Sequence, residues 1–171
     1  MSRRFWVFAY ASLMWEPGFE PEETQTAWIN GYHRALCILS IRYRGTGDNP
    51  GLVMGLDLGG SCRGQAHLVK RGEEEEVASM LHEREMPTGV YRPLNLKTRL
   101  EDGRHVEALA YVARRDHEQY CRLPEDKAAR LIRDGVGQKG RAFDYLDCTI
   151  RRMDALGIHD VSLRRILESA R

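Results

Sequence analysis

One stretch decides how the N-terminal part of the chain folds: Phe8-Ala9-Tyr10-Ala11-Ser12-Leu13-Met14-Trp15-Glu16-Pro17. The aromatic and β-branched residues at 5–8 are typical of a buried strand, which then gives way to small residues and a proline. Small side chains let a ligand approach the backbone closely, so this loop predicts N–H groups that can hold a carboxylate or a carbonyl oxygen. The alternative is a junction that only packs its large side chains into the core.

A second informative position is Glu85, at the end of a predicted helix over residues 73–84. Val77 and Leu81 precede it at steps of four, and residues at that spacing share one helix face. If the helix extends to Glu85, the carboxylate faces the core and loses hydration, as a general acid/base often does. The alternative is an ion pair with Arg84 or Arg92 that only stabilises a bend.

Composition limits the classes of partner. The chain has 171 residues, with 26 Lys and Arg against 25 Asp and Glu, so its formal net charge is +1. This balance gives no electrostatic reason to expect nucleic acid or an anionic membrane as partner. The apolar fraction of 42% is near that of globular proteins, and no apolar run is long enough to span a membrane.

The cysteines and histidines predict no metal site. The four cysteines lack a C-x-x-C spacing, and the six histidines show no H-x-x-x-H spacing. The N-terminus has no apolar segment followed by a cleavage site, so we expect no signal peptide and a cytoplasmic protein with reduced thiols. A cysteine hydrolase that uses Cys37 or Cys148 is a remote alternative.

The segment pattern predicts an α+β fold with a curved or closed sheet, in one domain over residues 1–171. One or two strands are expected over 27–40, and a hairpin of strands 51–58 and 62–70 around Gly59-Gly60-Ser61. Strands over 94–100 and 106–112 flank an Asp102-Gly103 turn. Apolar residues at three- and four-residue steps then predict helices over 125–135, 141–156 and 162–169.

A third polar region covers residues 40–51, which are rich in glycine and carry two arginines. Such a segment can clamp a ligand carboxylate, because a guanidinium binds carboxylates with two hydrogen bonds. It can equally be a solvated loop.

Taken together, these segments resemble the ChaC-type γ-glutamylcyclotransferase family. Residues 8–15 are similar to the family's F-G-Y-G-S-L-x-W, and 31–34 to its G-Y-x-R. Residues 40–53 resemble its S-x-x-x-R-G-T-x-x-x-P-G-x-V, and 84–91 its R-E-x-x-x-G-Y. Residues 137–146 and 156–160 resemble two further segments near the C-terminus, so the likeness covers nearly the whole chain.

The resemblance implies a mixed β-barrel with flanking helices and a helical C-terminal part. It also implies cleavage of the γ-glutamyl amide of glutathione to 5-oxoproline and Cys-Gly, with no metal or organic cofactor. Glu85 matches the family's catalytic glutamate. The substrate-binding residues that it implies or makes plausible are Phe8, Ala9, Tyr10, Ala11, Ser12, Leu13, Ser40, Arg44, Tyr91 and Tyr111.

Two positions depart from the family pattern, because Ala9 and Ala11 stand where the family has glycines. A positive φ at Ala11 would be strained, and the added methyl groups would narrow the pocket. The departures leave open a cyclotransferase for other γ-glutamyl amides and a non-catalytic γ-glutamyl-binding protein of the same fold. The sequence sets no oligomeric state.

Overall fold

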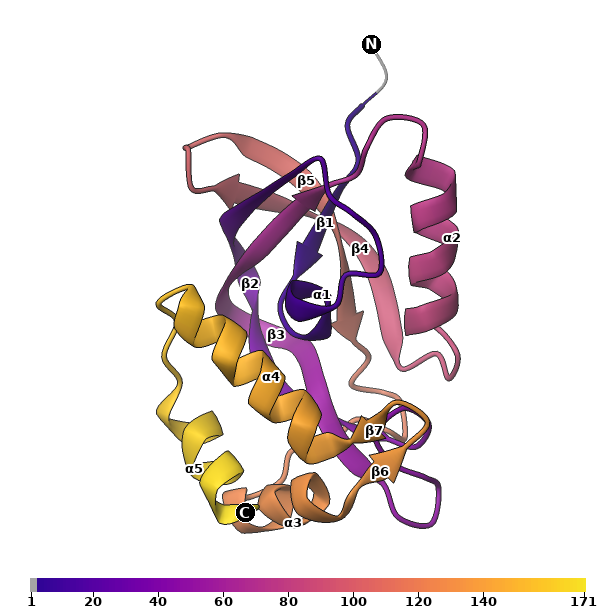
Figure 1. Cartoon of the computed structure of the whole chain (residues 1–171), viewed down its shortest axis with the longest axis vertical. Helices are drawn as coiled ribbons and strands as arrows, with labels where there is room; N and C mark the ends of the chain where they lie inside the picture. Colours follow the sequence, from indigo (N-terminus) through magenta and orange to yellow (C-terminus); the bar gives the residue numbers. More distant parts are fainter. Residues whose placement is uncertain (1–2) are drawn as a thin grey trace. The chain divides into compact units, whose positions relative to one another are not determined.

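The computed structural model describes residues 3–171 (Figure 1). Met1 and Ser2 lie outside the described residues. They are the first residues of the N-terminal segment for which no signal peptide was predicted. Contacts divide the chain into two compact units, which we describe one at a time. The first contains the described residues up to Arg34 together with Leu56–Arg114, and the second contains Ala35–Gly55 and Arg115–Arg171. The prediction of one domain over 1–171 stays a prediction.

The first unit is built on a closed barrel of mixed strands. Its strands follow the order β1-β3-β2-β4-β5, and β3 also pairs with β5. Their bounds are β1 Trp6–Ala9, β2 Glu23–Ser40, β3 Gly51–Leu68, β4 Tyr91–Leu100 and β5 His105–Ala113, with β2 and β3 running on into the second unit. β1 is antiparallel to β3 and parallel to β5. The predicted α+β class with a mixed barrel is confirmed.

The apolar runs in the barrel strands supply the side chains that are buried in its core. All of β1 is buried, as expected for a strand that lies between two others. Val7 and Leu56 are fully buried, and Phe8 is 1% exposed. Gly64 in β3 lies so close to β1 that a methyl group built on it would overlap the carbonyl oxygen of Ala9. The absence of a side chain at Gly64 therefore permits the close approach of these strands.

The predicted hairpin over 51–70 is wrong, because β3 is one strand that passes through Gly59 and Gly60. Both glycines have positive φ angles, 102° and 71°, which bend the strand without reversing it. His33 in the neighbouring strand β2 hydrogen-bonds through Nδ1 to the carbonyl oxygen of Gly59 at 2.9 Å. A local turn signal was thus overridden by pairing with a long neighbouring strand.

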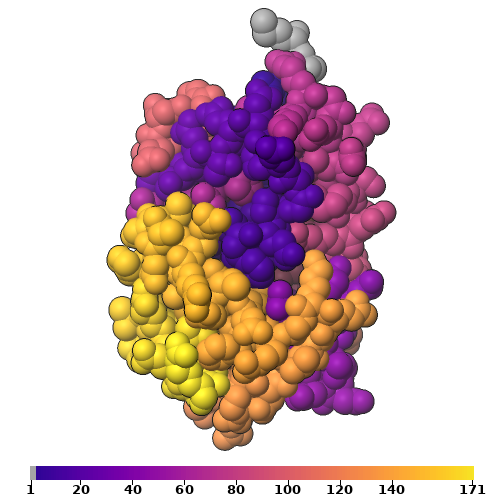
Figure 2. All heavy atoms as spheres, in the orientation of Figure 1, coloured from indigo at the N-terminus to yellow at the C-terminus, as the bar shows by residue number. Residues whose placement is uncertain are grey.

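Two helices of the first unit follow barrel strands. α1, Ser12–Trp15, comes directly after the loop that ends β1, and α2, Glu74–Glu85, follows β3. Three glutamates occupy the first turn of α2, where the positive end of the helix dipole favours them. The chain after α1 lies against α2. The contact is close at Gly18, where an added methyl group would stand 3.2 Å from Cε of Met80. Figure 2 shows this indigo segment at the surface beside the magenta one.

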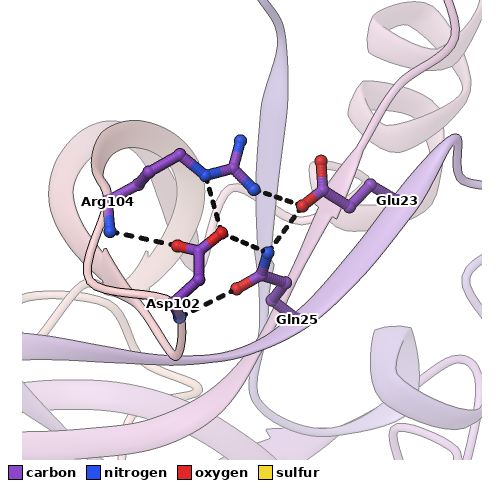
Figure 3. Close-up of polar contacts among 4 residues, drawn as sticks. All are labelled: Glu23, Gln25, Asp102 and Arg104. Carbon is purple, nitrogen blue, oxygen red and sulfur yellow. Dashed lines mark hydrogen bonds and ion pairs between the residues drawn. The ribbon is translucent and has the colours of Figure 1, made fainter.

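A polar cluster fixes the predicted turn between β4 and β5 (Figure 3). Gln25 Nε2 donates to Oδ2 of Asp102 at 2.8 Å, and its Oε1 accepts from the backbone N–H of Asp102 at 3.2 Å. Arg104 donates through Nε to the same Asp102 oxygen at 2.8 Å and also contacts Glu23. The turn is therefore tied to the start of β2.

The second unit contains the C-terminal helices that the sequence predicts. They are α3 Glu125–Asp134, α4 Ala142–Ala155 and α5 Val161–Ser169, and α3 packs against both of the others. Asp160 caps α5 by accepting from the backbone N–H of Leu163 at 3.0 Å. A two-stranded hairpin of β6, Val136–Gly137, and β7, Gly140–Arg141, was not predicted. Among residues 3–171, no helix is both long and apolar enough to cross a membrane.

Candidate active site

The loop between β1 and α1 is buried, and neither of its alanines has the positive φ that would favour glycine. Ala9 is fully buried, and Tyr10 and Ala11 are 7% and 5% exposed. Ala11 has a φ of −147°, and no residue other than glycine has a positive φ within 3–171. The positive φ that would strain an alanine at this position is therefore absent.

Three successive N–H groups of this loop lack an intramolecular acceptor. The described part of the chain offers no hydrogen-bond partner to the backbone N–H of Ala11, Ser12 or Leu13, whereas that of Met14 donates to Ala11 at 2.9 Å. These are the first donors of α1, and the first N–H groups of a helix have no carbonyl acceptor within it. They can bind an anionic or carbonyl oxygen of a ligand.

Side chains of barrel strands hold the loop in place. Arg34, from β2, donates through Nε to the carbonyl oxygen of Tyr10 at 2.6 Å. The hydroxyl of Tyr10 donates to the backbone carbonyl of Tyr111 in β5 at 3.0 Å. His67, from β3, donates through Nε2 to the carbonyl oxygen of Leu13 at 3.0 Å, while its Nδ1 lies 2.9 Å from Oγ1 of Thr24. The loop is therefore fixed from three strands before any ligand binds.

Glu85 is the last residue of α2, and its side chain is only 15% exposed. Val77 and Leu81, at steps of four before it, are 4% and 0% exposed. The predicted helix face is confirmed, since all three side chains point away from solvent. In contrast, Glu83 on the same helix is exposed. The ion pair that sequence offered as an alternative is also present, with Arg84 Nε 3.7 Å from Oε1 of Glu85.

The charge of Glu85 acts on Tyr111, a residue of the barrel strand β5. Tyr111 is 3% exposed, and burial, followed by the negative charge of Glu85, raises the pKa of Tyr111 to about 12. The phenol is therefore neutral at physiological pH and can donate a hydrogen bond. Tyr91 lies on the same face of the β4–β5 ladder, because Tyr91 pairs with Ala113 and Tyr111 with Pro93.

Ser40 and Arg44 belong to the second unit and are bonded to each other there. The backbone N–H of Arg44 donates to Oγ of Ser40 at 3.0 Å, and its Nη1 donates to the carbonyl oxygen of Arg141 at 3.2 Å. The guanidinium also lies over the ring of Tyr145, 5.7 Å from its centroid. These contacts stabilise the loop over 41–50, so the predicted role of both residues in substrate binding stays a prediction.

No role was predicted for Arg34 or His67, and for Arg84 only an ion pair with Glu85, although all three shape this site. Arg34 and Arg84 each stand inside a motif, but a motif does not say which carbonyl or hydroxyl an arginine binds. His67 alternates with the apolar residues of β3 and looks like an ordinary core position. Within residues 3–171, no three histidine, cysteine, aspartate or glutamate side chains gather so that they could hold a metal ion.

The barrel, the donor loop and the largely buried carboxylate at the end of α2 can be compared with solved structures. A crystal structure of a yeast γ-glutamylcyclotransferase specific to glutathione superposes with a TM-score of 0.87 at 19% identity, covering 99% of this chain and 96% of that one. A second structure, a γ-glutamyl cyclotransferase, superposes with a TM-score of 0.57 at 11% identity, covering 96% and 86%. The fold is that of the γ-glutamylcyclotransferases.

A family model described as "ChaC-like protein" matches residues 5–171, so the chain belongs to the ChaC-like family. The resemblance inferred from the motifs is confirmed. The glutathione-specific γ-glutamylcyclotransferase of Escherichia coli strain K12 is 34% identical over 97% of this chain and 72% of the relative. Glutathione-specific γ-glutamylcyclotransferase 1 of Mus musculus is 30% identical over 82% of this chain and 66% of the relative.

Proposed function

We propose that this chain is a γ-glutamylcyclotransferase that cleaves the γ-glutamyl amide of glutathione by cyclisation and releases 5-oxoproline and Cys-Gly. Membership of the ChaC-like family supports the reaction, and the names of the relatives from Escherichia coli and Mus musculus support the substrate. Glu85 is the general acid/base of this reaction. The proposed environment is reducing and cytoplasmic, where the four cysteines, which form no disulfide among residues 3–171, stay as thiols.

The chemistry needs one group that moves protons. Glu85 takes a proton from the α-ammonium of the substrate, and the amine nitrogen then forms a bond to its own γ-carbonyl carbon. The tetrahedral intermediate collapses with cleavage of the bond to the cysteine nitrogen, which receives the proton held by Glu85. The ring nitrogen loses its second proton to the released amine, so that the lactam is neutral and the Cys-Gly amine leaves as an ammonium ion. Because the nucleophile belongs to the substrate, ring closure is intramolecular and needs no enzyme nucleophile. All atoms and protons balance without a metal or an organic cofactor.

The remaining groups bind and polarise the substrate. The three N–H groups of Ala11, Ser12 and Leu13 bind the glutamyl part and stabilise the oxyanion that forms at the γ-carbonyl. The neutral hydroxyl of Tyr111 donates to a substrate oxygen, with Tyr91 beside it on the same sheet face. Phe8, Ala9, Tyr10, Ser40 and Arg44 complete the proposed binding residues.

One observation carries the assignment of Glu85: its side chain is 15% exposed at the end of a helix whose other inward side chains are buried. A carboxylate in such surroundings is shielded from bulk water, and its charge reaches the buried phenol of Tyr111. The carboxylate of Asp102, in contrast, lies in an exposed cluster of charged and polar side chains.

The test is a 5-oxoproline assay with glutathione and with γ-glutamyl-alanine. Wild-type protein should release 5-oxoproline from glutathione, and Glu85→Gln should lower kcat by at least ~100-fold, as removal of a general acid/base does. Glu83→Gln is the matched control, because Glu83 is exposed on the same helix, and it should keep the wild-type rate. Equal activity in the two variants would remove Glu85 from the mechanism.

The same assay separates the competing functions. Product from γ-glutamyl-alanine alone would assign the enzyme to other γ-glutamyl amides, which the methyl groups of Ala9 and Ala11 would favour by narrowing the pocket. Binding of glutathione without turnover by the wild-type protein would establish a binding protein of this fold. Activity that persists after thiol alkylation would remove the cysteine hydrolase, for which Cys37, fully buried in β2, is a poor nucleophile.

A further inference from the structure

Arg84 joins the donor loop to the end of the helix that carries Glu85. Its Nη1 donates to the carbonyl oxygen of Glu16 at 2.7 Å, and its Nη2 donates to Oγ of Ser12 at 3.0 Å. Its Nε forms an ion pair with Glu85, 3.7 Å from Oε1. Only 11% of this charged side chain is exposed, so contacts within the protein, these among them, replace most of its hydration.

The shape of the guanidinium makes these contacts geometrically dependent on one another. A guanidinium is planar and presents five N–H donors in fixed directions, whereas a lysine ammonium is a point charge on a flexible stem. One rigid plane therefore touches both ends of α1 and the neighbouring carboxylate at the same time. Neither the Ser12 hydroxyl nor the Glu85 carboxylate can shift without breaking a contact to this plane.

The contact also restricts the direction of the Ser12 hydroxyl hydrogen, which is kept away from Arg84. Because its oxygen accepts from Arg84, its hydrogen points elsewhere, and the described residues provide no acceptor for it. Ser12 stands beside the unpartnered N–H groups of Ala11 and Leu13. Arg84 thus orients a fourth donor at the place where the backbone already offers three.

We propose that Arg84 is a positioning residue: it sets the donors at Ser12 and its neighbours at a fixed place relative to Glu85 and acts only through them. This inference rests on the proposed function, since it concerns the alignment of the substrate carbonyl with its proton carrier. Misplacement of reacting groups by about 1 Å can cost 100-fold in rate. The charge of Arg84 alone is insufficient for this role, because the fork geometry provides the alignment.

The kinetic test compares Arg84→Lys and Arg84→Gln with Arg71→Gln, which changes an exposed arginine in the turn before α2. Both Arg84 variants should lose ~10–100-fold in kcat with glutathione while KM changes by less than about threefold, and Arg71→Gln should match wild type. In a Ser12→Ala background, Arg84→Gln should lose less than it does alone, because part of its action passes through that hydroxyl. A lysine variant with the wild-type kcat, or fully additive losses, would overturn the proposal.

A second measurement does not depend on turnover. Arg84→Gln should speed amide hydrogen exchange over residues 12–16, and Arg71→Gln should leave it unchanged. If the wild-type protein turns over no γ-glutamyl compound, the proposed function fails, and exchange still decides whether Arg84 holds the loop. Unchanged exchange over 12–16 in Arg84→Gln would remove the positioning role.

Discussion

The pKa of Tyr111 offers a direct test of where the charge of Glu85 lies. Burial and then the Glu85 carboxylate raise this pKa from 10.0 to about 12, which amounts to about 3 kcal/mol in favour of the neutral phenol. The carboxylate contributes the smaller part. Glu85→Gln should therefore lower the pKa of Tyr111, by less than half of its increase over the ordinary value.

The same shift sets a window of pH-dependent stability. Because the pKa is raised in the folded state, the folded protein keeps a phenolic proton that the unfolded chain has already lost between pH 10 and about 12. The stabilisation from Tyr111 is fully present below that window and is lost as pH rises through it. In Glu85→Gln the loss should be smaller.

The assay is the ultraviolet absorbance of phenolate after rapid pH jumps. Since the chain has seven tyrosines, the Tyr111 signal is obtained by subtracting the curve of the matching Tyr111→Phe protein, in the wild-type and Glu85→Gln backgrounds. If Tyr111 titrates at the same pH in both backgrounds, or at a higher pH without the carboxylate, the charge of Glu85 does not raise the pKa of Tyr111. Either result would place the charge of Glu85 away from the phenol and from the proposed site.

Three further perturbations test the fold around the site. Gly64→Ala should cost ~1–3 kcal/mol or more in urea unfolding, because the new methyl group overlaps the end of β1, whereas Gly47→Ala meets nothing within 4 Å and should leave stability nearly unchanged. Tyr10→Phe should cost ~1–3 kcal/mol, measured the same way, because it leaves a buried carbonyl without its hydroxyl donor. Hydrogen bonds to Asp102 lower its pKa, so its stabilising effect should be present above pH 3.8 and fade in acid, and unfolding measured from pH 5 down to 2 should be flatter in Asp102→Asn.

Local patterns predicted most of the elements, and long-range pairing decided the main exception. The helix stripe that ends in Glu85 and the turn at Asp102 depend on neighbours within a few residues, and both were found. The hairpin at Gly59 and Gly60 was wrong, because the same residues that reverse a chain can also bend a strand. Only the partner strand β2, which continues past the bend, distinguishes these outcomes.

The candidate site was predictable as a set of motifs but not as a set of contacts. The donor loop and Glu85 came from residue types at fixed positions. The partners of Arg34 and Arg84 did not, because the carbonyl and hydroxyl groups they bind lie 24 and 72 positions away along the chain. The negative φ of Ala11 was also hidden, since a glycine in relatives does not show which backbone angles the position adopts.

Because β2 and β3 run on from one compact unit into the other, neither unit is encoded by one continuous segment of the gene. Each unit is assembled from two separate stretches of the chain, so no single cut of the gene releases either one whole. A messenger RNA truncated after the codon for Arg114 would encode Ala35–Gly55 without the C-terminal helices that belong to the same unit. A fragment that keeps one unit whole must therefore also contain part of the other.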